Sequence, residues 1–282
     1  MGGPRDQTRG SQGAPLAEKT TVLDANGNQI AQFYEEYRET ITLDQVAPIM
    51  KTAIISIEDF RFYEHGAIDI EGTIRALAKN FTSGGIAQGG SSITQQYVKQ
   101  VLLNSATTDE ERNAALEASY ARKLRELRYA MAVEEKYTKD EILEKYLNIA
   151  YFGAHANGIE AAAKRFFGVK ASELSLVQAA TLAGAVQDPN ATDPNLGKAQ
   201  RKKLLHRRNV VLDRMAELKK ITVEEAAEAK KKPLGYKGTP CPAAARPARI
   251  RTSACTSATR CSATRRSARR PRPGASSSTA AA

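Results

Sequence analysis

Hydrophobic residues recur three and four positions apart along most of the chain, a spacing typical of amphipathic helices. The pattern predicts helices over Ile68–Phe81, Ser92–Leu103, Asp109–Lys136, Lys139–Asn148, Ile159–Phe167, Glu173–Val186, Ala199–Lys219 and Val223–Lys231. An earlier helix is expected through Met50, Ile54 and Ile57, with Thr42 or Asp44 as its cap. The sequence therefore predicts a mainly α protein.

A short β-hairpin is expected before these helices. Val22–Phe33 alternates apolar and polar residues around Asn26-Gly27. Asn-Gly supplies the positive φ angles that a two-residue hairpin turn requires. We therefore expect a flexible leader over residues 1–19 and a folded domain over residues 20–236.

Composition separates the last 46 residues, 237–282, from this domain. From residue 239 onward the chain holds nine Arg, no acidic residue and all three Cys, whereas the preceding residues carry a net charge of only +2. A segment rich in Arg, Ala, Ser, Thr and Pro cannot bury a core, so we expect disorder. Two interpretations stay open, a basic arm for an anionic partner and a shifted reading frame; the abrupt loss of acidic residues favours the second.

Several classes of function lack sequence support. There is no His-Glu-x-x-His, Cys-x-x-Cys or P-loop motif, and no apolar run long enough to span a membrane. The overall net charge of +11 comes mainly from the tail, which argues against a nucleic-acid-binding body.

Two polar segments are candidates for chemistry. Glu58 and Asp59 end the first helix, where the helix dipole disfavours carboxylates, so they are either solvated or retained for catalysis. The Gly89–Lys99 segment runs from a Gly-rich loop into a helix and suits either a phosphate or sugar ligand or a simple N-cap.

Three charged segments are ambiguous when taken singly. Arg122 and Glu126 are four residues apart and could form a surface ion pair. Glu141 and Lys145 have the spacing of a helix-supporting pair. The basic pair at 207–208 precedes an apolar stripe and is typical of a solvated face.

Taken in order, these five segments resemble the motifs of the peptidoglycan glycosyltransferases, glycosyltransferase family 51. The family patterns are Glu-Asp-x-x-Phe-x-x-His, Gly-x-Ser/Thr-x-Thr-Gln-Gln, Arg-Lys-x-x-Glu, Lys-x-x-Ile-Leu-Glu-x-Tyr-Leu-Asn and Arg-Arg-x-x-Val-Leu. They match residues 58–65, 90–96, 122–126, 139–148 and 207–212. The resemblance covers about residues 20–236.

The resemblance implies polymerisation of lipid II into β-1,4 glycan strands, with inversion and release of undecaprenyl pyrophosphate. By motif position Glu58 is the general base and Glu126 the second catalytic carboxylate, although an ion pair with Arg122 remains an alternative. Expected to bind substrate are Asp59, Phe62, His65, Gly90, Ser92, Thr94, Gln95, Gln96, Lys99, Arg122 and Lys123. Among them Phe62 and His65 are expected to shape the cleft, and the three cations to meet the donor phosphates. The basic pair at 207–208 is interpreted as structural support.

The family fold is a lysozyme-like helical lobe with a small membrane-proximal jaw, which by position falls in about residues 70–120. The resemblance implies action at the extracytoplasmic face of the bacterial membrane, with lipid II, the lipid-linked glycan and the membrane surface as partners and no nucleic acid. It implies no obligatory cofactor and no dedicated metal site, and it allows Mg²⁺ or Mn²⁺.

The family's membrane anchor is missing from this sequence, and no Ser-x-x-Lys or Lys-Thr-Gly motif follows residue 236. We therefore interpret the chain as a truncated class A penicillin-binding protein without its transpeptidase domain. The alternative is a lysozyme-like glycan-cleaving enzyme, a lytic transglycosylase or muramidase, which also needs a Glu acid/base.

Overall fold

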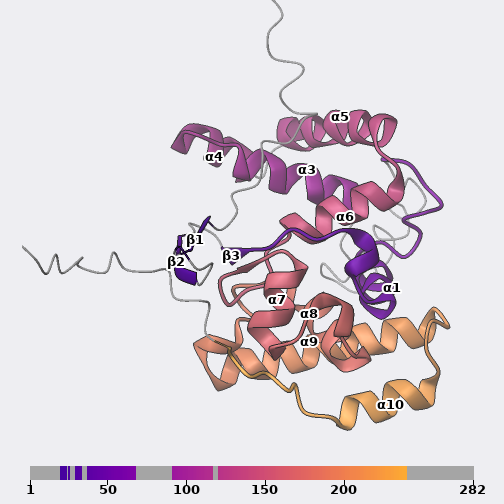
Figure 1. Ribbon diagram of the computed structural model, residues 1–282. Coiled ribbons are helices and arrows are strands. Elements are labelled where there is room, and N and C mark those ends of the chain that lie inside the picture. Colours follow the sequence, from indigo (N-terminus) through magenta and orange to yellow (C-terminus); the bar gives the residue numbers. More distant parts are fainter. Residues whose placement is uncertain are drawn as a thin grey trace, which may run out of the picture. The chain divides into compact units, whose positions relative to one another are not determined.

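The computed structural model describes residues 20–23, 25, 29–33, 37–67, 91–116 and 120–239. All of them belong to one compact unit, Met1–Arg246. Within these ranges the chain is mostly helical, with a few short strands, which confirms the predicted mainly α class (Figure 1). The leader, the helix predicted over 68–81, Gly90 and the tail beyond 239 lie outside the described residues.

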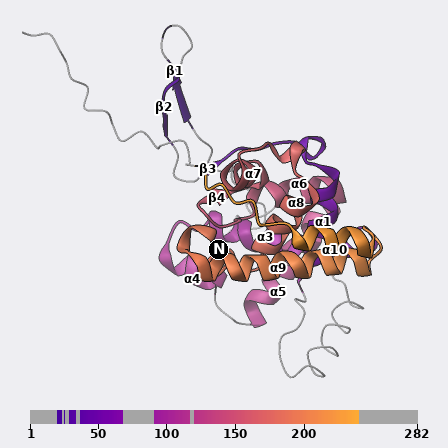
Figure 2. The ribbon, with the colours of Figure 1, turned by 90° about the horizontal axis from the view of Figure 1, so that it is seen from below.

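Strands occur only as short pairs in the described part of the chain (Figure 2). β1 (Thr20–Leu23) pairs antiparallel with β2 (Gln29–Phe33), which confirms the predicted hairpin. β3 (Tyr37–Arg38) pairs in parallel with β4 (Ala156–Asn157), a contact that the hydrophobic pattern did not predict. This second pair joins the start of the domain to its middle.

Helix α1 (Pro48–Glu58) begins later than predicted. Thr42 instead caps the short 3-10 turn η1 (Leu43–Gln45), so the predicted cap was assigned to the wrong element. The reason is Pro48, which fits the first turn of a helix but disfavours helical geometry in the residue before it. The helix end, at Glu58, lies where the sequence places a pair of acids.

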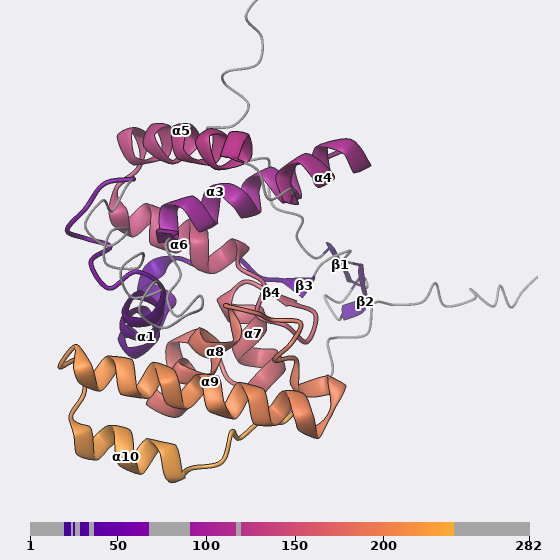
Figure 3. The ribbon, with the colours of Figure 1, turned by 180° about the vertical axis from the view of Figure 1, so that it is seen from behind.

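Four helices of the described residues after α1 carry most of the predicted site residues. They are α3 (Ile93–Asn104), α4 (Asp109–Leu116), α5 (Tyr120–Lys136) and α6 (Lys139–Ile149). Helix α3 packs against α4, α5 and α6 (Figures 1 and 3). The single helix predicted over 109–136 appears as α4 and α5, with residues 117–119 between them outside the described residues.

Helix α6 begins with a capping box. Glu141 Oε2 accepts a 2.8 Å hydrogen bond from the Thr138 backbone N–H. Lys145 places its Nζ 4.6 Å from the centre of the Tyr137 ring. Hydrogen bonds from Thr138 lower the pKa of Glu141, and the positive charge of Lys145 lowers it further, so the predicted support between Glu141 and Lys145 acts through charge rather than through a direct ion pair.

The remaining helices complete the core beneath α1. They are α7 (Ile159–Phe167), η2 (Ala171–Glu173), α8 (Leu176–Ala185), η3 (Pro194–Leu196), α9 (Lys198–Glu217) and α10 (Val223–Lys231). Helix α8 runs along α9, both contact α1, and α10 packs on α9 (Figure 3).

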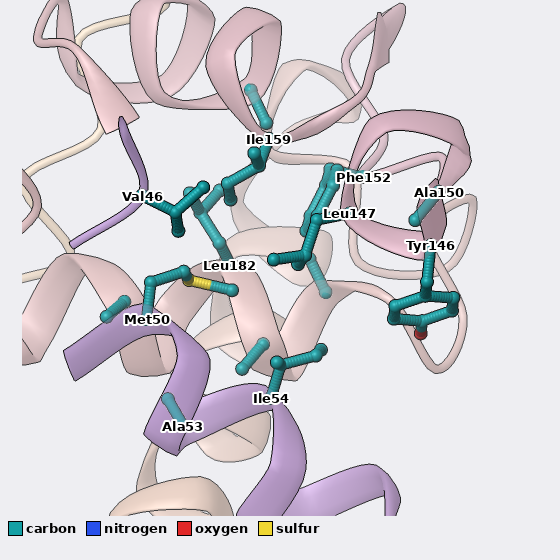
Figure 4. Close-up of a cluster of buried hydrophobic side chains, with 14 of the residues drawn as sticks. Val46, Met50, Ala53, Ile54, Tyr146, Leu147, Ala150, Phe152, Ile159 and Leu182 are labelled. Atoms are coloured by element: carbon teal, nitrogen blue, oxygen red, sulfur yellow. The ribbon is translucent and has the colours of Figure 1, made fainter. Parts of the chain in front are cut away.

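A buried apolar cluster joins these layers (Figure 4). Met50 and Ile54 from α1, Leu147 from α6 and Leu182 from α8 are all fully buried. Each such side chain contributes about 1.5–3 kcal/mol relative to an exposed one. The cluster thereby fixes α1 rigidly, and with it the position of Glu58.

Candidate active site

Glu58 ends α1 with its side chain partly exposed. Its Oε2 accepts a 2.7 Å hydrogen bond from Nε2 of Gln96 in the first turn of α3. Among the described residues no other group donates a hydrogen bond to this carboxylate, so Oε1 stays available. A carboxylate held by one oxygen and open at the other has the geometry of a general base.

The orientation of the Gln96 amide is set by Tyr146 of α6. The buried Tyr146 hydroxyl donates to Gln96 Oε1 at 3.1 Å, which turns the amide NH₂ group toward Glu58 (Figure 4 shows Tyr146 beside the core). An amide N–H donor stabilises the ionised carboxylate more than the protonated one. Tyr146, Gln96 and Glu58 thus form a hydrogen-bonded chain that ends at the Glu58 carboxylate.

Burial raises the pKa of Glu58, because the surrounding protein displaces water from the charged form. The Gln96 hydrogen bond and the positive charge of Arg207 lower this pKa in part, while the neighbouring Asp59 raises it slightly. The Glu58 carboxylate also contributes to raising the pKa of Tyr146, after burial as the larger cause. A base with a raised pKa is a stronger proton acceptor once it is ionised.

Asp59 explains how two acids are tolerated at a helix end. Its Oδ2 accepts a hydrogen bond from the Ile93 backbone N–H at 3.2 Å, at the start of α3. Its Oδ1 lies 2.7 Å from Nε2 of His65. The positive end of the α3 dipole and the His65 ring therefore offset the unfavourable end of α1. Asp59 holds α1 and α3 together beside the base.

A second cluster of charges lies on α3 and α5. The buried Glu126 pairs with Arg122 and, at 3.6 Å, with Lys123. Burial lowers the pKa of Lys123, Glu126 raises it in part, and the charges of Arg122 and Lys99 lower it further. Lys99, on α3, makes no hydrogen bond or ion pair with any described residue. Two cations paired with one carboxylate, with Lys99 on the helix that packs against α5, form a cluster of net positive charge, which suits an anionic ligand.

The first turn of α3 connects the base to this cation cluster. Gln96 holds Glu58, and the adjacent Gln95 accepts a 2.9 Å hydrogen bond from Nζ of Lys123. Lys123 also donates to the Ser91 hydroxyl at 2.8 Å. Neighbouring residues of one helical turn thus fix the base and a cation relative to each other.

Other predicted site residues have partners inside the protein. Ser92 is the N-cap of α3, and its Oγ accepts from the Gln95 backbone N–H at 3.3 Å. The buried Thr94 hydroxyl donates to Glu134 at 2.5 Å, and the Phe62 ring is fully buried beneath Lys139. Substrate contact by these residues stays a prediction, since the structure gives each a supporting role.

The two arginines of the fifth motif, both interpreted above as structural support, lie in different environments on α9. Arg208 is fully buried and donates to the carbonyls of Lys230 and Lys232 at 2.9 and 2.6 Å, so the structural role predicted for it is confirmed. Arg207 is partly exposed, and its structural role stays a prediction. No signal in the linear pattern distinguishes two adjacent arginines on one helix.

The described residues contain no group of three or more His, Cys, Asp or Glu arranged to bind a metal ion. No helix among them has both the length and the apolar character needed to cross a membrane.

Comparison with known proteins gives matches over most of the domain. A family model described as Transglycosylase matches residues 26–216. Penicillin-binding protein 1A/1B of Bacillus subtilis is 42% identical over 215 residues, covering 75% of this chain and 22% of that protein. Penicillin-binding protein 1A of Escherichia coli is 38% identical over 206 residues, covering 72% of this chain and 22% of that protein.

A solved structure also aligns. The alignment with the crystal structure of penicillin-binding protein 1A from Haemophilus influenzae covers 81% of this chain and 22% of that protein's chain, with a TM-score of 0.44 and 22% sequence identity. The chain spans about a fifth of the length of these relatives.

Proposed function

Since this chain belongs to the transglycosylase family, the glycosyltransferase family 51 domain of class A penicillin-binding proteins, we propose that it polymerises lipid II into β-1,4 glycan strands. The observation that carries this proposal is the Glu58 carboxylate, which is bound through one oxygen to Gln96, while the adjacent Gln95 binds Lys123 of the cation cluster.

In the proposed reaction Glu58 removes the proton from the acceptor's 4-hydroxyl. The hydroxyl oxygen forms a bond to C1 of the donor sugar while the bond from C1 to the pyrophosphate oxygen breaks, which inverts C1. The proton remains on Glu58 Oε1, and the bonding electrons leave with the pyrophosphate. An alcohol is a weak nucleophile at neutral pH, so a positioned base contributes about 10²–10⁴-fold to the rate.

The cation cluster serves the leaving group. Negative charge grows on the pyrophosphate as the C1–O bond breaks, and fixed cations stabilise that transition state more than the ground state. Lys99 is suited to this role, because no described residue pairs with it. Arg122 and Lys123 are held in place by Glu126, which we assign as a positioning carboxylate for the cluster.

The proposed substrates place the reaction at a membrane surface. Lipid II and the growing glycan both carry undecaprenyl chains, so we propose the extracytoplasmic face of the bacterial membrane as the site of action. Where a divalent cation takes part, we propose that it screens the charge of the substrate pyrophosphate.

The cation cluster also separates this proposal from glycan cleavage. A lysozyme-like cleaving enzyme needs a Glu acid, but its neutral leaving group gives it no use for such a cation cluster. The raised pKa of Glu58 alone would suit either reaction. The cluster around Glu126 therefore favours the transferase.

The test is polymerisation of purified lipid II in detergent by the wild-type chain and by Glu58→Gln. We expect glycan strands from the wild type and a loss of about 10²–10⁴-fold in kcat for the variant. Glu135→Gln, at an exposed position on α5, is the matched control and should behave as wild type. Folding of each protein is checked by circular dichroism.

Three outcomes would contradict the proposal. If Glu58→Gln polymerises as fast as wild type, Glu58 is not the base. If the folded wild type makes no strands, this chain lacks the activity. If soluble fragments appear instead from preformed peptidoglycan, the glycan-cleaving alternative is correct.

A further inference from the structure

Both ring nitrogens of His65 face hydrogen-bond acceptors. Nε2 lies 2.7 Å from Oδ1 of Asp59, and Nδ1 lies 2.6 Å from the carbonyl oxygen of Gly66. A carbonyl oxygen carries no proton, so Nδ1 must donate to it. The side chains of His65 and Asp59 are only 10% and 6% exposed, which leaves water little access to the pair. The charge on the ring therefore depends on what Asp59 does.

Asp59 accepts hydrogen bonds through both oxygens. Its Oδ2 accepts from the Ile93 backbone N–H at the start of α3, so neither oxygen needs a proton of its own. An imidazole is a stronger base than a carboxylate, and a proton shared between the two groups resides on the imidazole. Since Nδ1 also donates, His65 holds a proton on each nitrogen and is an imidazolium.

The surrounding charges agree with a cation at this position. Apart from Asp59, the charged groups on the segment of the ring, at the end of α1 and in the first two turns of α3 are Glu58, Arg61, Glu64 and Lys99. Glu58 and Asp59 are adjacent acids. An imidazolium at His65 offsets the charge of Asp59, so that the three groups together carry the single negative charge of the base.

The two hydrogen bonds of His65 close a loop between α1 and α3. They connect Asp59 to the Gly66 carbonyl, at opposite ends of the segment 59–67. Next to Gly66, the carbonyl of Ala67 accepts a 2.9 Å hydrogen bond from Nε2 of Gln95, whose Oε1 binds the cation cluster. The ring therefore connects the end of the helix that carries the base to the turn that holds a cation.

We propose that His65 acts as an imidazolium and is a positioning residue, whose two N–H groups hold the segment after Glu58 against α3 and so fix the base relative to the cation cluster. This role deepens the proposed function and rests on it. A neutral imidazole has only one N–H donor, so loss of a proton releases either Asp59 or the Gly66 carbonyl. The role is therefore present while the ring is charged and is lost as the pH rises.

The charge of the ring is tested first without turnover, in the wild-type chain. The ring nitrogens of the three histidines are labelled with ¹⁵N, and the exposed His155 and His206 are assigned by the signals lost in His155→Gln and His206→Gln. At about pH 6 we expect protons on both His65 nitrogens. Both protons should exchange slowly with water, whereas those of the two exposed rings should exchange too fast to be observed.

Kinetics give the second readout. His65→Gln and His65→Phe both remove the charge, and only the first keeps a polar group. At pH values where NMR shows the wild-type ring charged, kcat/KM of both variants should be about tenfold below wild type, the effect of one lost hydrogen bond to a charged group. The difference should shrink at pH values where the wild-type ring is neutral, because wild type has then lost the same bond. His155→Gln is the matched control and should follow wild type at every pH.

The outcomes separate this inference from the proposed function. A neutral His65 ring at a pH where His155 and His206 are both charged overturns the inference, and so does a ring with only one slowly exchanging proton. A loss of kcat/KM that is equal at every pH shows a structural role and also overturns it. If both protons are found but the folded wild type makes no glycan strands, the proposed function fails and the charge of His65 stands. The NMR measurement uses the wild-type chain, so it decides the charge even if the variants do not fold.

Discussion

Replacing Gln96 tests the hydrogen-bonded chain that ends at the base. Gln96→Leu keeps the approximate volume but removes both the 2.7 Å bond to Glu58 and the acceptor of the 3.1 Å bond from Tyr146. Tyr146 is only 1% exposed, so water cannot replace the lost acceptor. We expect the free energy of unfolding to fall by about 1–3 kcal/mol for the stranded hydroxyl. This loss of stability should be larger at pH values at which Glu58 is ionised, because the variant lacks the Gln96 amide that stabilises the charged carboxylate.

A double-mutant cycle of Gln96→Leu and Tyr146→Phe measures the coupling between the two side chains. Tyr146→Phe alone leaves Gln96 partly exposed and able to bind water, so it should cost about 0.5–1.5 kcal/mol. In the Gln96→Leu background the same change removes the stranded hydroxyl and should be neutral or stabilising. Urea unfolding of the four proteins, followed by circular dichroism, measures the coupling.

Activity should respond differently from stability in the same four proteins. The double variant should be more stable than Gln96→Leu. It should polymerise lipid II no faster than Gln96→Leu does, because in both proteins Glu58 lacks its hydrogen-bond donor. Strictly additive losses of stability would refute the hydrogen-bonded chain. Recovery of lipid II polymerisation in the double variant would refute the role of Gln96 in holding the base.

Three further predictions follow from the same geometry. Because folding raises the pKa of Glu58, the stability that its protonated form contributes is present below the pKa of the unfolded state and is lost as the pH rises through the pKa of the folded state. Glu58→Gln should therefore have a higher Tm than wild type at pH 7–8, and the difference in Tm should disappear below pH 4. A difference in Tm that stays constant with pH would contradict this prediction. Arg208→Met should lower the free energy of unfolding by about 1–3 kcal/mol and speed hydrogen exchange in α10, since two carbonyls lose their donor, whereas unchanged exchange would refute its structural role. Lys99→Met should lower kcat/KM by about 10²-fold and change the free energy of unfolding by less than about 0.5 kcal/mol. Glu126→Gln should lower the free energy of unfolding, measured with urea, by about 3 kcal/mol because it breaks a buried ion pair. Equal stability of the two variants would contradict the assignment of Lys99 to the ligand and of Glu126 to positioning.

Local pattern was enough to predict most of the helices. The apolar spacing located α6 through α10 within a few residues, because each buries one face against a neighbour. It failed where a single residue overrides the pattern, as Pro48 does at the start of α1. It also failed for β3 and β4, since two-residue strands carry no periodicity.

For the candidate site, too, the sequence predicted some features and missed others. The order of the motifs indicated Glu58 and the cations as candidates, but it could not indicate which partner each side chain takes. Thr94 binds Glu134 across 40 residues of sequence, and Asp59 binds the Ile93 backbone N–H across 34 residues. Such pairings depend on tertiary packing, which a linear spacing does not encode.

The parallel pairing of Tyr37 with Ala156 has a consequence for the order of folding. Arg38 and Ile41 bind Asn148, more than 100 residues later, and α1 rests on α8 and α9. Contacts this distant close slowly, because the intervening loop entropy is lost before the contact forms. On a ribosome, the first helix must therefore wait for nearly the whole domain to emerge. Any chain cut before α9 would leave α1, and the Glu58 at its end, without one of the helices on which α1 packs.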